Sequence, residues 1–328
     1  MLCTRPPTPR RCKDMATFFL TLSVRDGTAS VIYWRIGFCC KSLLSKLHKY
    51  AKQVIFIIDF DMVILLKLVQ VYDIDMGKKI HDIIATQGLL KTNIMLGNAL
   101  VDMYAKCGVL TKAQFVFDEL SVRNAISWSA LIAGFAQQGQ SQEALDCFQR
   151  MRNEGFSPTV SSWNALLGGY AQQGLAKEAL DCFQWMQQED ISPDAITFVN
   201  VLNACSHSGL VDEGQLYFHN MKEKYGIAPD KEHFTCMVDL FGRARLFGKA
   251  MRVIKTMPSS DYPPVWSALL GACQKWGNVK LGKFAFERAI QLDECDAAAY
   301  VLMTNIYAAA GMQEEAEIIK RMKMKNAA

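Results

Sequence analysis

The chain has 328 residues, of which 51% are apolar and 21% charged, and its formal net charge is +4. This balance is ordinary for a folded protein, and it excludes wholesale disorder, collagen-like sequence and low-complexity classes. The charge is uneven, because residues 1–52 have a net charge of +8 and the rest of the chain has −4. A general positive surface is therefore not what attracts a ligand to the body of the protein.

Residues 1–52 form a basic leader, with ten Lys or Arg residues against only Asp14 and Asp26. A basic, hydroxyl-rich and acid-poor leader is typical of an organelle transit peptide. Three prolines and Gly27 interrupt any long amphipathic helix in it, so a mis-started or non-native leader is the alternative. The apolar run that follows, residues 54–69, contains two Asp and one Lys, which argues against a membrane span.

Eleven cysteines are scattered through apolar runs, and no pair has the C-x-x-C spacing. They are predicted to be reduced, buried, small apolar residues, and neither a disulfide framework nor a metal site. We expect no cofactor and no metal.

A repeat of about 35 residues organises the chain after the leader. The segment AQQGQSQEALDCFQRM, residues 136–151, returns as AQQGLAKEALDCFQWM, residues 171–186, with twelve of sixteen positions identical. A turn glycine closes the first half of each unit, and Arg245 stands where a further glycine is expected. The units set by these turns are residues 94–124, 125–159, 160–194, 195–230, 231–262, 263–296 and 297–328.

Each unit is predicted to form two helices. In residues 160–194, apolar residues recur at helical spacing on both sides of Gly174, which we expect to close the first helix. Pro193 is predicted to stop the second helix, and Asp194 to cap the next one. No convincing strand pattern occurs beyond the leader. Because a helix pair cannot bury its own apolar face, the sequence predicts an all-α fold, a right-handed α-solenoid of stacked helix-turn-helix repeats with a concave groove.

Two positions near the start of each unit behave differently. The fourth is aromatic in six of seven units, with Gly97 the exception, and we interpret these rings as core. The fifth is small and polar in five units, which predicts a row of hydrogen-bonding groups along one surface. The fourth-position aromatics are Trp128, Trp163, Phe198, Phe234, Trp266 and Tyr300, and the polar fifth residues are Asn98, Ser129, Asn164, Thr235 and Ser267.

Residues 160–194 resemble the 35-residue pentatricopeptide repeat. The alternation of unit lengths is similar to the short and long repeat variants of the plant-type (PLS) subfamily, and differs from the constant 34 residues of tetratricopeptide repeats. Residues 94–262 resemble five such repeats, and 263–328 resemble two E-type extension motifs, the second truncated. Residues 53–93 resemble one more, degenerate, long repeat, recognised by GKKIH at residues 77–81.

The resemblance implies sequence-specific binding of single-stranded RNA in a mitochondrion or chloroplast, with one base read per repeat. It implies that the fifth and last residues of each repeat contact the base, and that an apolar second residue sandwiches it. Asn with Asp resembles a uracil pair, and Asn with Asn a pyrimidine pair. The carried-over base-contacting pairs are Asn98 with Asn124, Ser129 with Thr159, Asn164 with Asp194, Val199 with Asp230, and Thr235 with Tyr262, and the sandwiching residues are Met95, Ile126 and Ile196. Ser161 and Glu232 depart from the apolar second position. Alternatively, Thr159, Asp194 and Asp230 are simply helix N-caps.

Relatives in this family often end in a zinc deaminase, whose chemistry needs H-x-E and C-x-x-C. Neither pattern occurs here, and no phosphate-binding loop, zinc-protease or serine-hydrolase motif is present. We therefore predict a binding protein and not an enzyme. The hypothesis is an RNA-binding adaptor for C-to-U editing that recruits a deaminase in trans, without a membrane or small-molecule partner. The alternative is a tetratricopeptide-type scaffold that binds a peptide, which the negative body charge favours.

Overall fold

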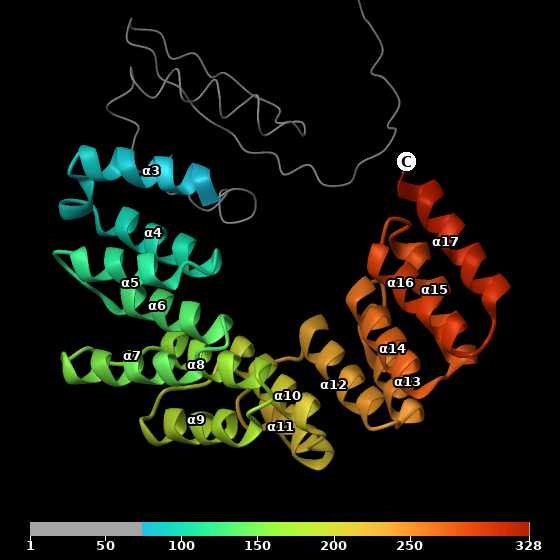
Figure 1. The fold of residues 1–328 in the computed structure, drawn as a ribbon. Helices are drawn as coiled ribbons and strands as arrows, with labels where there is room; N and C mark the ends of the chain where they lie inside the picture. The colour runs from blue at the N-terminus through green and yellow to red at the C-terminus, as the bar shows by residue number, and fades with distance from the viewer. Residues whose placement is uncertain (1–73, 328) are drawn as a thin grey trace, which may run out of the picture. The chain divides into compact units, whose positions relative to one another are not determined.

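The computed structural model describes residues 74–327, and the elements in this part of the chain are α-helices and one short 3-10 turn, with no strand (Figure 1). The basic leader, the apolar run 54–69 and the start of the degenerate repeat lie outside the described residues. The elements are α3 (Ile74–Thr86), η1 (Leu89–Lys91), α4 (Ile94–Lys106), α5 (Leu110–Glu119), α6 (Ala125–Gln137), α7 (Ser141–Asn153), α8 (Val160–Gln172), α9 (Ala176–Gln188), α10 (Ala195–Ser208), α11 (Val211–Glu223), α12 (Lys231–Arg243), α13 (Phe247–Thr256), α14 (Pro263–Trp276), α15 (Val279–Leu292), α16 (Ala297–Ala309) and α17 (Gln313–Ala327).

The helices pack as a series of pairs. From α4 onward, each even-numbered helix packs on the odd-numbered helix that follows it and also on the next even-numbered helix, as α8 does on α9 and α10. Each pair thus covers the apolar face of its neighbour, which is what a two-helix unit needs to be stable. The predicted all-α solenoid of stacked helix pairs is confirmed. Within the described range, none of the helices is both long and apolar enough to cross a bilayer.

The fourth-position aromatics are core residues, as predicted. Trp128, Phe198 and Trp163 are at most 1% exposed, and only Phe234 is partly buried, where its ring meets that of Phe218. Gly97 breaks the series for a steric reason. A Cβ at this position would lie 2.3 Å from Cδ2 of Leu120, so the Leu120 side chain occupies the space of the missing aromatic.

The first turn of each unit has the left-handed backbone that a glycine favours. Gly174 has φ of 72° and follows Gln173, the C-cap of α8, so it ends this helix as predicted. Arg245 has φ of 63° at the equivalent turn after α12, so the missing glycine has not changed the turn.

The prediction that Pro193 stops the second helix of its unit is wrong. Helix α9 ends at Gln188, and Asp190 then takes φ of 55° while the amides of Asp190 and Ile191 donate to the carbonyls of Gln187 and Met186. This is the hydrogen bonding of a Schellman turn. Asp190 therefore ends the helix, although its residue type is strained in this conformation.

We expect Asp190→Gly to raise the free energy of unfolding by about 0.5–1 kcal/mol, because glycine adopts a positive φ without strain. Gly155 is the matched control, since it stands at the same place in the preceding repeat with φ of 84°. Gly155→Ala should lower the free energy of unfolding by about 1 kcal/mol. Urea unfolding followed by circular dichroism measures both, and equal effects of the two substitutions would contradict this reading of the turn.

Most of the described cysteines are buried, as predicted. The buried ones are Cys147, Cys182, Cys205, Cys236 and Cys273; Cys107 is half-buried, and Cys295 is exposed. Burial raises the pKa of Cys182 and Cys236 to about 12, so both stay protonated and unreactive at neutral pH.

Candidate functional site

The last residues of four repeats are helix N-caps. Each side chain accepts a hydrogen bond from the backbone N–H of the third residue of the next repeat, and that third side chain bonds back to the backbone N–H of the cap. This is the reciprocal arrangement of a capping box. The third residues are all fully buried. The pairs are Asn124 with Ser127, Thr159 with Ser162, Asp194 with Thr197, and Asp230 with His233. Thr159, Asp194 and Asp230 are thus helix N-caps, as the alternative interpretation of these residues predicted.

Asp194 caps the next helix and also forms a hydrogen bond with Asn164, the fifth residue of its own repeat. Nδ2 of Asn164 donates to Oδ1 of Asp194 at 3.0 Å, and the Thr197 hydroxyl lies 2.7 Å from Oδ1 of Asn164. Asn164 is 9% exposed, and the network joins α8 to the start of α10. The structure therefore brings together the fifth and last residues that the sequence paired.

The first repeat contains a second network of the same design. Nδ2 of Asn98 lies 3.4 Å from Oδ1 of Asn124, and the Ser127 hydroxyl donates to Oδ1 of Asn98 at 2.6 Å. Asn98 is also 9% exposed. In both networks the hydroxyl makes the shorter of the two contacts to the amide.

The other predicted pairs are not joined by a hydrogen bond among the described residues. The hydroxyls of Ser129 and Thr235 donate to the carbonyls of Ala125 and Lys231, one turn back in their own helices, both at 2.7 Å. Val199 has no polar side-chain group with which to contact Asp230. In these two repeats the fifth residue does not reach the last one, because its short hydroxyl bonds within its own helix.

At Asp230 a histidine replaces the usual Ser or Thr of the third position. Nε2 of His233 lies 2.9 Å from the Ala195 carbonyl, and Nδ1 lies 2.5 Å from Oδ1 of Asp230. Since a carbonyl only accepts, Nε2 carries a hydrogen. Burial of the Asp230 carboxyl raises its pKa, but the hydrogen bonds with His233 outweigh this and hold the pKa below its ordinary value.

The three predicted sandwiching residues are exposed. Met95, Ile126 and Ile196 are 56%, 65% and 60% exposed, although each lies in the first turn of a helix and the residue that follows it is buried. Large apolar side chains at one register and facing solvent can contact a flat ring. The structure thus leaves them available for the contact that the resemblance implies.

Sequence reasoning missed one fifth and last pair, in the region that resembles an extension motif. The Ser267 hydroxyl lies 3.3 Å from Oδ2 of Asp296, which caps α16. The polar series already included Ser267, and Asp296 precedes a helical run as a cap would. Extending the pairing to residues 263–296 would have found this contact.

The two amide networks leave different groups available to a ligand. Among the described residues, no group donates a hydrogen bond to the carboxylate oxygen Oδ2 of Asp194, and one Nδ2 hydrogen of Asn164 remains, so this repeat offers a donor beside an acceptor. In the first repeat, Oδ1 of Asn124 is engaged by the Ser127 amide, and its Nδ2 remains. That repeat offers two neighbouring donors.

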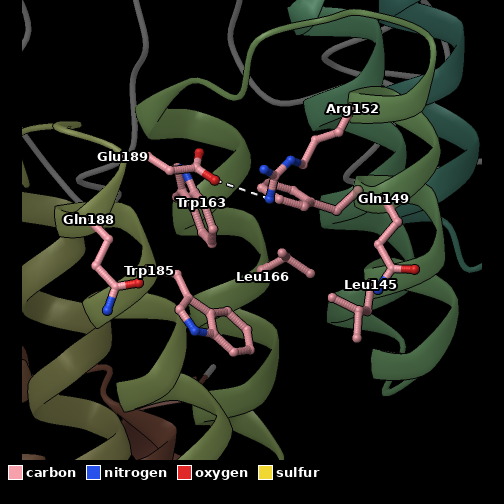
Figure 2. A pocket seen from close by; sticks show the side chains of 9 residues that line it. Leu145, Gln149, Arg152, Trp163, Leu166, Trp185, Gln188 and Glu189 are labelled. Atoms are coloured by element: carbon pink, nitrogen blue, oxygen red, sulfur yellow. Dashed lines mark ion pairs between the residues drawn. The ribbon is translucent and has the colours of Figure 1, made fainter.

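A pocket of about 370 Å³ lies away from these networks, between α7 and α9 over α8 (Figure 2). Leu166, Trp163 and the 46% exposed Trp185 line it, and Arg152 pairs with Glu189 across 3.0 Å at its side. Trp185 replaces the Arg150 of the otherwise similar preceding repeat, whose guanidinium pairs with Asp118. The described residues contain no group of three His, Cys, Asp or Glu side chains that could hold a metal ion.

Family models match most of the described chain. A PPR repeat family model matches residues 158–207, a pentatricopeptide repeat domain model matches 122–173, and a PPR repeat model matches 98–124, 196–225 and 232–262. An E motif model matches residues 276–328.

The chain belongs to the pentatricopeptide repeat family. Its repeats followed by an E motif fit the PLS subfamily, as the sequence predicted. Two pentatricopeptide repeat-containing proteins of Arabidopsis thaliana, At4g16470 and At4g14820, are both 37% identical to it over 76% and 77% of this chain. A third Arabidopsis relative, named as mitochondrial, is 32% identical over 73% of this chain. The chain spans less than half of these three relatives, 43%, 30% and 44% of their lengths.

Solved structures of the pentatricopeptide repeat protein PPR10 share the fold. PPR10 in complex with an 18-nt psaJ RNA element superposes with a TM-score of 0.67 at 18% identity, over 88% of this chain and 43% of that one. A second structure, of PPR10 from maize, gives a TM-score of 0.53 at 19% identity, over 87% of this chain and 42% of that one.

Proposed function

We propose that this protein binds single-stranded RNA and reads bases with the fifth and last residues of its repeats. The observation that carries the proposal is the Asn164 and Asp194 contact, repeated by Asn98 and Asn124, which presents unused hydrogen-bonding groups at a repeat boundary. Exposed Ile196, beside Asp194, supplies an apolar surface for a base. The fold shared with PPR10, which binds RNA, supports the proposal.

The base preferences follow from the groups left available. A donor beside a carboxylate acceptor fits a carbonyl beside an imino N–H, as uracil presents, so we assign uracil to residues 160–194. Two donors side by side fit the adjacent O2 and N3 acceptors of cytosine, so residues 94–124 prefer this pyrimidine. Asp and Asn at the last position have the same shape, and they differ in charge and in whether the outer group accepts or donates a hydrogen bond.

The wider role rests on the resemblance and on the E motif. We propose an adaptor in a mitochondrion or chloroplast, with no catalytic site of its own, that recruits a deaminase in trans for RNA editing. Relatives named as mitochondrial and the basic leader support an organelle. We retain the division into a degenerate repeat at residues 53–93, five repeats at 94–262 and two extension motifs at 263–328.

The test uses the full chain and a randomised pool of single-stranded RNA, with sequencing of the retained fraction. Asp194→Asn should move the preference at one RNA position from uracil toward cytosine by about tenfold, the effect of one base-edge contact. Asn124, at the same position of another repeat, caps its helix and contacts the fifth residue of its repeat. We therefore expect Asp194→Asn to keep the fold. Asp181→Asn, on the second helix α9, is the control for the loss of one negative charge.

Two outcomes would contradict the proposal. Retention of no RNA at low salt, with capture of peptides instead, would favour the tetratricopeptide-type scaffold that the negative body charge suggests. Equal weakening of all sequences by Asp194→Asn would show that Asp194 acts only as a helix cap.

A further inference from the structure

Within the repeats that the structure describes, the third residue forms a side-chain hydrogen bond with the fifth residue of the repeat before it only where that fifth residue is asparagine. The Ser127 hydroxyl bonds to Asn98, and the Thr197 hydroxyl bonds to Asn164. Ser162 is also a third residue, but the fifth residue of the repeat before it is Ser129. The Ser162 hydroxyl instead donates to the carbonyl of Thr159 at 2.8 Å. The contact is thus specific to the amide and is not a general feature of the cap.

The chemistry of the contact fixes the amide. The Thr197 hydroxyl has one hydrogen and two acceptors in reach, Oδ1 of Asn164 at 2.7 Å and Oδ1 of Asp194 at 2.9 Å, and the amide oxygen is the nearer. Because Nδ2 of Asn164 donates to Asp194, the two ends of the amide have different partners. Thr197 is fully buried and Asn164 is 9% exposed, so water cannot readily replace the hydroxyl. Without it, the amide oxygen would be buried without a partner, which favours rotation of the side chain away from this place.

We propose that Thr197 is a positioning residue for base recognition: its hydroxyl holds the Asn164 amide in the orientation that distinguishes uracil from cytosine. Ser127 does the same for Asn98. The inference rests on the proposed function and adds a third residue to each reading site, supplied by the following repeat. At the next boundary the preceding fifth residue is Val199, and His233 bonds to the Ala195 carbonyl instead.

Three variants separate positioning from helix capping. Thr197→Val removes the hydroxyl and keeps the shape of the side chain, and Thr197→Ser restores the hydroxyl. Ser162→Ala is the matched control, because it removes the same capping bond, here to the backbone N–H of Thr159 at 2.8 Å, without touching an asparagine. Any effect of weakened capping should therefore appear in both Thr197→Val and Ser162→Ala.

The first measurement is selection from the randomised RNA pool with the full chain. Thr197→Val should reduce the uracil preference at the position that Asp194→Asn identifies by about tenfold, as expected for one misplaced base-edge contact. Thr197→Ser and Ser162→Ala should keep it within about twofold. A wild-type preference that persists in Thr197→Val would overturn the inference and leave the proposed function intact.

The second measurement needs no RNA. In a sample with 15N-labelled asparagine side chains, the Nδ2 protons of Asn164 should exchange with water about tenfold faster in Thr197→Val than in Thr197→Ser, because the anchored amide is released. Unchanged exchange in Thr197→Val would overturn the inference even if the chain bound no RNA. Failure of the proposed function would instead appear as a wild-type chain without base preference.

Discussion

Trp163→Ala should lower the free energy of unfolding by about 3–5 kcal/mol, the largest effect we expect from a single substitution in this chain. The indole is 1% exposed, its ring lies 4.6 Å from that of Phe148, and it lines the pocket over α8. Because the indole is part of the pocket lining (Figure 2), we expect its removal to enlarge this pocket. Urea unfolding measures the loss, and a change below about 1 kcal/mol would show that the pocket walls close over the site.

The indole nitrogen provides a sharper control. Nε1 of Trp163 is buried and has no hydrogen-bond partner in the described part of the chain, whereas Nε1 of Trp266 donates to the Ser260 carbonyl at 3.0 Å. Trp163→Phe removes an unsatisfied donor and should cost about 1 kcal/mol; Trp266→Phe breaks a bond and should cost about 1 kcal/mol more. Equal costs would indicate that Trp163 has an unseen partner such as a buried water.

Gly169→Ala should lower the free energy of unfolding by about 2–3 kcal/mol, because two helices touch at this glycine. A Cβ there would lie 2.4 Å from Cβ and 3.0 Å from Cα of Ala136, so α6 and α8 would have to move apart. Urea unfolding of the full chain measures this effect. A loss smaller than about 1 kcal/mol would show that the two helices separate at little cost.

Gly168 is the matched control in the same helix. The atoms nearest to a Cβ there belong to the end of the Asn200 side chain, the closest at 3.3 Å, and alanine favours a helix, so Gly168→Ala should stay within about 1 kcal/mol of the wild type. Adding Ala136→Gly to Gly169→Ala should recover about 1 kcal/mol through relief of the closest contact. If the changes in the free energy of unfolding from Gly169→Ala and Ala136→Gly simply add, the strain does not arise from the contact between these two residues.

The sequence predicted those features of the fold that repeat. Helix pairs, turn glycines and the buried aromatics follow from periodicity, since the same side chain serves the same purpose in every unit, as Trp128 and Trp163 do. The predicted end of α9 was wrong because a proline, Pro193, is a well-known sequence signal for the end of a helix. Asp190, which ends the helix, adopts a left-handed backbone that its residue type does not indicate.

The site was predictable in its positions but not in its contacts. Register placed Asn164 beside Asp194, but whether a fifth residue reaches its partner depends on side-chain length and on competing carbonyls, as Ser129 shows. The third residues were missed, although a cap followed three positions later by Ser or Thr, as in Asp194 and Thr197, was visible in the sequence. Their second contact crosses between repeats, and no local pattern shows it.

The capping boxes have a consequence for exchanging repeats between proteins. Asn164 lies in one repeat, whereas its partner Thr197 lies in the next, so a graft cut after residue 194 would join Asn164 to a foreign third residue. A cassette that begins at the fifth residue of one repeat and ends at the third residue of the next, residues 164–197 here, transfers the amide, the carboxylate and the hydroxyl together.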